Sequence, residues 1–316
     1  RYWKKMEELY LAVVGVKDTK KYFDRTEYMM DCIRFNRSYI SRKTKKILVT
    51  ANMSAGKSTL LNSLIGKKVN KTQNDTCTAK THLLYNKAFE DSLSYEYDYD
   101  LELNASLEVL MEDNTNNVSK EIYVGTRFRT IEDIDIPICF IDTPGVNSSQ
   151  DEEHKKISEE MIINEEYDLL LYVLNGENIG TDDDKKHLRF VANNYKGRIV
   201  FVINKLDRFR AKDDSVKRTL ENVKKDLIEL GYNNPIVCPT SAYAAYLAKM
   251  KIFGEELNED ELDEYEGFCR KLKKDQFRFE QYYSEELTTE KNDNKEELLL
   301  LHSGILSLER ILYKER

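Results

Sequence analysis

One stretch of the chain, residues 51–59, has the residue types and spacing that hold phosphate groups. It follows an apolar run at 47–49 and precedes the helical pattern of residues 60–65. A loop between a strand and a helix directs backbone N–H groups and a helix N-terminus at one place, where they can bind an oxyanion. Lys57 would reach the β- and γ-phosphates of a nucleotide, and the Ser58 hydroxyl would bind Mg²⁺. We predict nucleotide contacts from these loop residues: Asn52, Met53, Ser54, Ala55, Gly56, Lys57, Ser58 and Thr59.

Ala51 departs from the usual pattern of a phosphate loop, which begins with glycine. Its methyl group is tolerated only if the turn does not require a positive φ at that position. The simpler alternative for the whole stretch is an ordinary strand-to-helix turn, in which Ser54 or Ser58 only caps the helix. The strand-like and helical flanks favour the phosphate site.

The segment Asp142-Thr143-Pro144-Gly145 supplies candidates for the metal and the γ-phosphate. It follows the apolar run at 136–141, so Asp142 lies at the carboxyl end of a strand, where it would hold a Mg²⁺-bound water. The N–H of Gly145 would face the γ-phosphate. Such a short match is weak by itself, because an ordinary turn can carry the same residues.

Two later segments distinguish guanine from adenine. Asn204, Lys205 and Asp207 follow the run at 199–203, and the Asp207 carboxylate can accept from both the N1–H and the exocyclic amine of guanine, a pair of donors that adenine lacks. Ser241 and Ala242 follow the strand-like residues 236–238, and their backbone would meet the guanine O6. All these segments occur in the order that a GTPase needs, each at the edge where open α/β sheets bind ligands. Together they predict a GTP-binding site.

Taken together, the motifs resemble those of the dynamin family of large GTPases, particularly its bacterial members. The resemblance covers about residues 44–250 and rests on the segments 53–59, 77–79, 142–145, 173–176 with 181–184, and 204–207. It implies that Thr78 is the switch threonine that closes over Mg²⁺ and the γ-phosphate, with Thr76 as the competing candidate, and that Ser54 belongs to the catalytic part of the loop. Eukaryotic members carry glutamine where this chain has Met53. The family also forms GTP-dependent homodimers through its G domains, and many members deform or fuse membranes.

The group that orients the attacking water is missing from its usual place. Small regulatory GTPases use a glutamine just after the glycine that corresponds to Gly145, but here Val146 follows. Gln150 lies farther along in a polar run, as expected for a solvated loop residue. We expect the water to be held by backbone groups, by Thr78 or by a group supplied in trans. The resemblance implies a monovalent cation such as K⁺ near Ser54, and a cation fixed by a dimer partner is chemically sufficient.

Composition fits an intracellular α/β enzyme. The 316 residues are 41% hydrophobic, enough for one large domain with appendages, and the net charge of −8 argues against a nucleic-acid partner. Five scattered cysteines indicate reduced thiols in the cytoplasm, and the four histidines form no constellation. We find no stretch that could span a membrane and no signal peptide. We expect a cytoplasmic protein whose peripheral membrane contact is made by regions outside this sequence. Because the chain begins with Arg1, we expect a fragment or a processed form.

The predicted fold is the α/β P-loop GTPase fold, a mostly parallel central sheet flanked by helices. We expect strands at 46–50, 82–89, 121–128, 136–141, 168–174, 198–203 and 235–238, and helices at 57–66, 181–194, 214–230 and 241–250. Residues 95–111 should form an exposed hairpin or helix. Four domains or segments follow: 1–43, an N-terminal helical part of a neck; 44–252, the GTPase core; 253–300, a charged helical insertion with loop; and 301–316, a C-terminal helix of the neck.

The last helix carries Leu301, Ile305, Leu308 and Leu312 on one face. We expect this face to pack on the GTPase core or on the N-terminal helix, as in a small neck bundle built from both chain ends. Two functional alternatives to a dynamin-like enzyme remain: a switch GTPase that recruits an effector, and a structural GTPase that forms filaments. Turnover that rises with protein concentration would favour the dimerising enzyme.

Overall fold

A computed structural model gives the structure of the chain. It describes residues 27–52, 54–69, 80–106, 108–110, 119–130, 136–143, 152–210, 215–284 and 294–313, together with helical residues Lys4 and Leu11. Among these residues, no helix is both long and apolar enough to cross a membrane.

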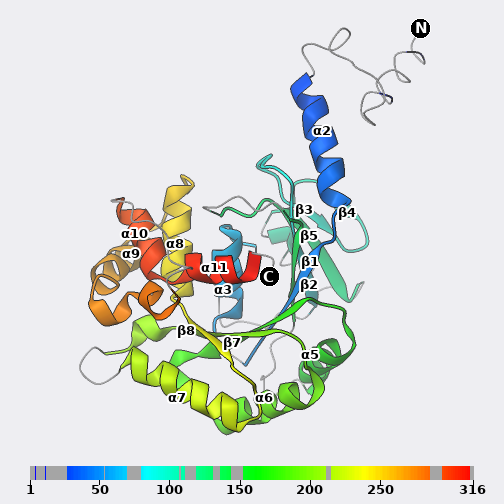
Figure 1. The fold of residues 1–316 in the computed structure, drawn as a ribbon. Coiled ribbons are helices and arrows are strands. Elements are labelled where there is room, and N and C mark those ends of the chain that lie inside the picture. The colour runs from blue at the N-terminus through cyan, green and yellow to red at the C-terminus, as the bar shows by residue number, and fades with distance from the viewer. Residues whose placement is uncertain are drawn as a thin grey trace.

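A nine-stranded sheet with the order β4-β3-β5-β2-β6-β1-β7-β8-β9 forms the centre of the fold (Figure 1). The strands β6, β1, β7, β8 and β9 are parallel, β2 runs antiparallel to β6, and β3 pairs antiparallel with both β4 and β5. The strand bounds are β1 Lys45–Ala51, β2 Thr81–Asn86, β3 Tyr95–Tyr97, β4 Leu101–Glu102, β5 Glu121–Thr126, β6 Ile138–Asp142, β7 Leu169–Asn175, β8 Ile199–Asn204 and β9 Ile236–Pro239.

Helices cover both faces of this sheet, which explains why its central strands are apolar at consecutive positions. Alternate residues of β1 show the division: Ile47 and Val49 face one apolar core, and Leu48 faces the other. The first core contains residues of α3 Lys57–Ile65, α8 Ala242–Ile252, α9 Glu259–Lys271, α10 Lys295–His302 and α11 Ile305–Tyr313. The second contains residues of α5 Glu152–Asn164, α6 Asp182–Asn194 and α7 Val216–Glu229.

Short 3₁₀ turns and one projecting helix complete the fold. The turns are η2 Gly176–Asn178, η3 Leu206–Arg208, η4 Asp275–Phe277 and η5 Phe279–Tyr282. The helix α2, Glu27–Ile40, extends away from the sheet in Figure 1. Its last turn is fixed by Tyr39, whose hydroxyl donates to the carbonyl of Ile136 at 3.1 Å and accepts from the Asn86 amide at 3.1 Å.

These elements confirm the predicted P-loop GTPase fold. For residues 95–111 the hairpin alternative is correct, because β3 and β4 pair antiparallel and only residues 108–110 of the remainder are described as helical. The predicted charged insertion holds the acidic helix α9, which begins with a capping box between Asn258 and Glu261.

The prediction of one continuous helix from residue 301 is wrong. The helix α10 ends at His302, and Gly304, at φ 78°, separates it from α11. A side chain at Gly304 would also meet the carbonyl oxygen of Pro239, so both backbone conformation and space require glycine there. Leu301, Ile305, Leu308 and Leu312 are all buried in the core that contains α3 and α8. The apolar face therefore packs on the GTPase core. A neck bundle with residues 1–26 stays a prediction, because all but two of those residues lie outside the described part of the chain.

Candidate nucleotide-binding site

The loop between β1 and α3 has the backbone of a phosphate-binding turn. Ser54 has φ 59° and Gly56 has φ 84°, and Gly56 is the N-cap of α3 without any side-chain cap bond. The alternative in which Ser54 or Ser58 merely caps the helix is therefore wrong. A Cβ at Gly56 would collide with the side-chain amide of Asn204. Glycine is thus required both for its conformation and for the close approach of another motif.

Lys57 and Asp142 meet at the mouth of this loop. The Lys57 Nζ donates to the Asp142 carboxylate and to the carbonyl oxygen of Thr143, and both charged side chains are buried. The contact follows from the sheet, since Val49 near the end of β1 is the register partner of Asp142 at the end of β6. Ser58 lies half-buried in the first turn of α3. A serine hydroxyl and a carboxylate are the hard oxygen donors that Mg²⁺ prefers, so Ser58 and Asp142 fit the predicted metal.

Asn204 joins three of the predicted motifs. Its Nδ2 donates to the carbonyl oxygen of Ala55 at 3.0 Å, and its Oδ1 accepts from the N–H of Ala242 at 3.0 Å. The next residue, Lys205, has φ 66° and donates from Nζ to the carbonyl oxygen of Ser54 at 2.7 Å. Asn204 and Lys205, at the end of β8, therefore form a clamp: they bond to backbone carbonyl groups of the phosphate loop, and Asn204 also connects the loop to the start of α8.

Asp207 is a buried carboxylate in the turn that follows β8. It lies in η3 and is only 8% exposed. Burial raises the pKa of its carboxyl, with the Ser241 side chain and nearby cations opposing this effect. A buried carboxylate gains from donors that replace its lost water, which matches the paired donors of guanine.

The N–H groups of Ser241 and Ala242 already have acceptors within the protein. Ser241 donates to the carbonyl oxygen of Ser303 at 3.0 Å, and Ala242 donates to Asn204. A contact of these two residues with the guanine O6 therefore stays a prediction.

Thr59, the last of the predicted phosphate-loop residues, is half-buried in the first turn of α3.

Sequence reasoning gave no role to two residues that touch the phosphate loop. Asn175, at the end of β7, donates from Nδ2 to the carbonyl oxygen of Ser54 at 3.2 Å. Asp184, in the first turn of α6, accepts from the side-chain amide of Asn52. Both lie in the segments 173–176 and 181–184 that carried the family resemblance. The sequence therefore identified these segments but not the contacts that Asn175 and Asp184 make.

Six residues that bear on catalysis lie outside the described part of the chain: Met53, Thr76, Thr78, Gly145, Val146 and Gln150. Their predicted roles stay predictions.

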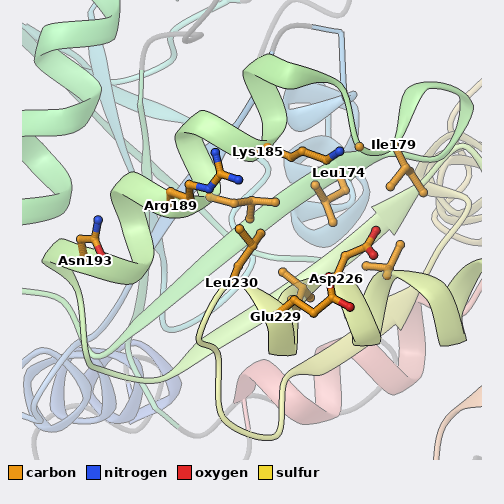
Figure 2. Close-up of a pocket in the computed structure, with 12 residues that line it drawn as sticks. Leu174, Ile179, Lys185, Arg189, Asn193, Asp226, Glu229 and Leu230 are labelled. Carbon is orange, nitrogen blue, oxygen red and sulfur yellow. The ribbon is translucent and has the colours of Figure 1, made fainter.

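A cavity of about 490 Å³ opens between α6 and α7 (Figure 2). Its floor is apolar, with Lys185 and Arg189 on the α6 side and Asp226 and Glu229 on the α7 side. None of the predicted nucleotide-binding residues lines it. This cavity is therefore separate from the strand-end cluster of Lys57, Asp142, Asn204 and Asp207.

Comparison with known proteins identifies the family. The sequence profile of the dynamin family matches residues 47–206, which include Lys57, Asp142 and Asn204. The chain belongs to the dynamin family. As a member of this family it carries a GTPase domain.

The fold of this dynamin-family chain is shared by solved structures of bacterial dynamins. Two structures of an oligomerised bacterial dynamin pair, described as a mechanism for long-range sensing and tethering of membranes, are 17% and 16% identical, each with a TM-score of 0.50. Each alignment covers 98% of this chain and 46% of the other, so the chain spans about half the length of those proteins. Era from Aquifex aeolicus, bound to GDP and AlF₄⁻, is 20% identical over 69% of this chain and 59% of its own, with a TM-score of 0.39. No curated protein sequence matches the chain.

Proposed function

We propose that this chain hydrolyses GTP and that GTP-dependent dimerisation of its GTPase domains activates the reaction. In the full-length protein, hydrolysis would be coupled to membrane remodelling by a cytoplasmic protein that contacts membranes peripherally. The observation that carries the proposal is Asn204, which holds the phosphate loop at Ala55 and the start of α8 at Ala242 while Asp207 lies three residues farther on. One side chain thus connects the phosphate-binding and base-recognition parts of the site.

The described residues divide the work of binding. Lys57 and the backbone N–H groups that begin α3 would hold the β- and γ-phosphates, because cations and helix N-termini stabilise these oxyanions. Ser58 and Asp142, with Thr78, would hold Mg²⁺. When bound, Mg²⁺ would offset the charge that develops on the phosphate oxygens. Asp207 would accept from guanine.

Dimerisation would complete the catalytic part of the site. Ser54 is held at a positive φ by two bonds to its carbonyl oxygen, from Asn175 and Lys205. This fixed geometry suits a residue that orders the γ-phosphate region. We propose that Thr78, Gly145 and a monovalent cation such as K⁺ supply the remaining stabilisation when two GTPase domains meet. The bacterial dynamin structures described as oligomerised pairs support this part of the proposal.

Base specificity provides the sharpest test. In Asp207→Asn, one acceptor becomes an amine donor that opposes the guanine amine but matches the carbonyl that xanthine carries at that position. Each lost or opposed hydrogen bond costs about 1–3 kcal/mol, so the variant should lose GTP and gain XTP. Competition of GTP, ATP and XTP for a fluorescent nucleotide measures the order of preference. Asp226→Asn, an exposed change on α7, is the matched control and should keep the GTP preference. An Asp207→Asn protein that still prefers GTP over XTP would overturn guanine recognition.

Dimer activation has its own test. Turnover per molecule should rise with protein concentration, and K⁺ should support it better than a larger organic cation that cannot enter the site. Slow turnover that is equal at all concentrations and in both cations would instead indicate a switch GTPase.

A further inference from the structure

A second set of contacts, separate from the Asn204 and Lys205 clamp, reaches the phosphate loop from β7 and α6. The Asn175 amide donates to the carbonyl oxygen of Ser54 at 3.2 Å. The Asn52 amide donates to the Asp184 carboxylate, which lies 132 residues later in the chain and is only 5% exposed. Both bonds act on residues that precede Gly56, on the part of the loop that lies before the helix N-terminus.

The chemistry of Asp184 fixes the orientation of Asn52. An ionised carboxylate only accepts hydrogen bonds, whereas an amide has a donor end and an acceptor end. Asn52 must therefore direct its Nδ2 toward Asp184 and its Oδ1 the other way. That Oδ1 is buried and has no hydrogen-bond partner among the described residues. Asp184 thus fixes the direction in which Asn52 presents its acceptor atom, Oδ1, within the phosphate loop. An asparagine at position 184 would not enforce that direction, because its side-chain amide can also donate.

The first two turns of α6 are themselves firmly held. Thr181 caps the helix by accepting from the N–H of Asp184 at 3.2 Å. One turn later, His187 Nδ1 bonds the Tyr172 hydroxyl of β7 at 2.7 Å, and both side chains are buried. Burial lowers the pKa of His187 to about 4, so this link is uncharged at neutral pH. The helical segment that carries Asp184 is therefore fixed on both sides, by the Thr181 cap before it and by the His187–Tyr172 bond after it.

Asn175 is also fixed in place. Its Oδ1 accepts from the N–H of Glu177 at 3.1 Å, so the amide that faces Ser54 cannot turn over without losing this bond. Ser54 adopts a left-handed backbone conformation that costs energy for a residue with a side chain, and it persists only where its surroundings hold it. The bonds from Asn175 and Lys205 to the Ser54 carbonyl do this.

We infer that Asn175 and Asp184 are positioning residues for GTP hydrolysis, which set the γ-phosphate side of the loop through Ser54 and Asn52. This inference rests on the proposed function. Neither residue needs to touch the nucleotide, and Lys57, Gly56 and Asp207, which would supply most of the binding, keep their own contacts when either is changed. Loss of positioning should therefore lower kcat and leave KM for GTP nearly unchanged.

The test compares Asp184→Asn and Asn175→Ala with two neighbours on the same segment. Asp183→Asn and Asn178→Ala change exposed residues and are the matched controls. We expect kcat to fall by about 10²-fold in both test variants, with KM within about threefold of the wild type, because small misplacements of reacting groups have effects of this size. The controls should keep wild-type kcat. Thermal unfolding of all four variants shows whether the fold is kept.

Three outcomes would overturn the inference. One is wild-type kcat in both test variants, and the second is an equal loss in the controls. The third is a loss of kcat that disappears when the variants are assayed at a temperature where they are fully folded, which would indicate stability alone. If Asp184→Asn does not fold, Asn175→Ala decides, since this residue is only half-buried. Failure of the proposed function looks different, because the wild-type protein itself would then not hydrolyse GTP.

Discussion

The two faces of the sheet bury polar side chains in different ways. On the face covered by α3, α8 and α11, the fully buried Lys249 donates to the Glu309 carboxylate at 2.5 Å and to the carbonyl oxygen of Leu64 at 3.1 Å. On the face covered by α6, Tyr172 and His187 form a buried polar pair, joined at 2.7 Å. The first pair carries charge, and the second is neutral.

The difference lies in what each pair connects. Lys249 ties the end of the phosphate-loop helix α3 to α8 and to the last helix, α11. Burial lowers the pKa of Lys249, and the nearby Glu309 carboxylate opposes this change. A buried ion pair adds little net stability compared with an apolar pair, but removing one member is costly. The contact therefore acts as a strict requirement for this arrangement of three helices.

The neutral pair holds α6 on the side of the phosphate loop. His187 lies one turn after Asp184, which contacts Asn52. A neutral pair avoids a second buried charge beside the Asp184 carboxylate. It gives a weaker constraint, and one that responds to acid, because the pKa of His187 is about 4 in the folded protein and 6.5 is its ordinary value.

Breaking the charged pair should have the largest effect on stability. In Lys249→Met, the Glu309 carboxylate stays buried without the ammonium, and we expect the free energy of unfolding to fall by about 3–5 kcal/mol. Urea denaturation measures this change. The double variant Lys249→Met with Glu309→Met should recover most of the loss, because apolar side chains of similar volume fill the same space. A single variant as stable as the wild type would show that the pair is no structural requirement.

Acid should weaken the face that carries His187. In the folded protein its pKa is about 4, while the ordinary value is 6.5, so between these values the unfolded chain binds more protons than the folded one. Stability is therefore complete above about pH 6.5 and is lost as pH falls toward 4, by about 3 kcal/mol from this group. Urea denaturation between pH 7.5 and 4.5 measures the loss.

His187→Gln isolates this contribution, since glutamine can still bond the Tyr172 hydroxyl but does not titrate. The variant should show a shallower decrease of stability over the same pH range. Equal slopes for the variant and the wild type would mean that other groups cause the acid sensitivity.

The sequence predicted those parts of the site that follow from strand ends. Asp142 and Asn204 each end an apolar run, and parallel strands bring their carboxyl ends to one edge of the sheet. Lys57 follows the loop after β1, and the pairing of β1 with β6 brings it to Asp142. Asp184 could not be predicted in the same way, because its contact with Asn52 depends on how α6 packs across the sheet.

At residues 301–313 the sequence pattern predicted which side chains are buried but not where the helix breaks. The apolar spacing of Leu301, Ile305, Leu308 and Leu312 suits one continuous helix, and all four side chains are in fact buried. The break at Gly304 does not interrupt this spacing, because α10 and α11 both bury their apolar residues in the same core. Periodicity therefore predicted the burial correctly and the continuity incorrectly.

The smallest of the expected effects concerns the Tyr172 hydroxyl. Tyr172→Phe removes the partner of His187 Nδ1 and leaves a neutral, buried polar atom without its hydrogen bond. Such a loss costs about 1–3 kcal/mol, less than a buried carboxylate that loses its cation, because only a neutral atom must be desolvated. Thermal and urea unfolding at pH 7.5 measure it, and Tyr97→Phe, at a residue that is 49% exposed, is the control with an expected change within about 0.5 kcal/mol. The comparison between the two faces depends on this ranking. If Tyr172→Phe destabilises the protein as much as Lys249→Met, then charge is not what separates the two buried pairs, and the packing around Tyr172 must carry the difference instead.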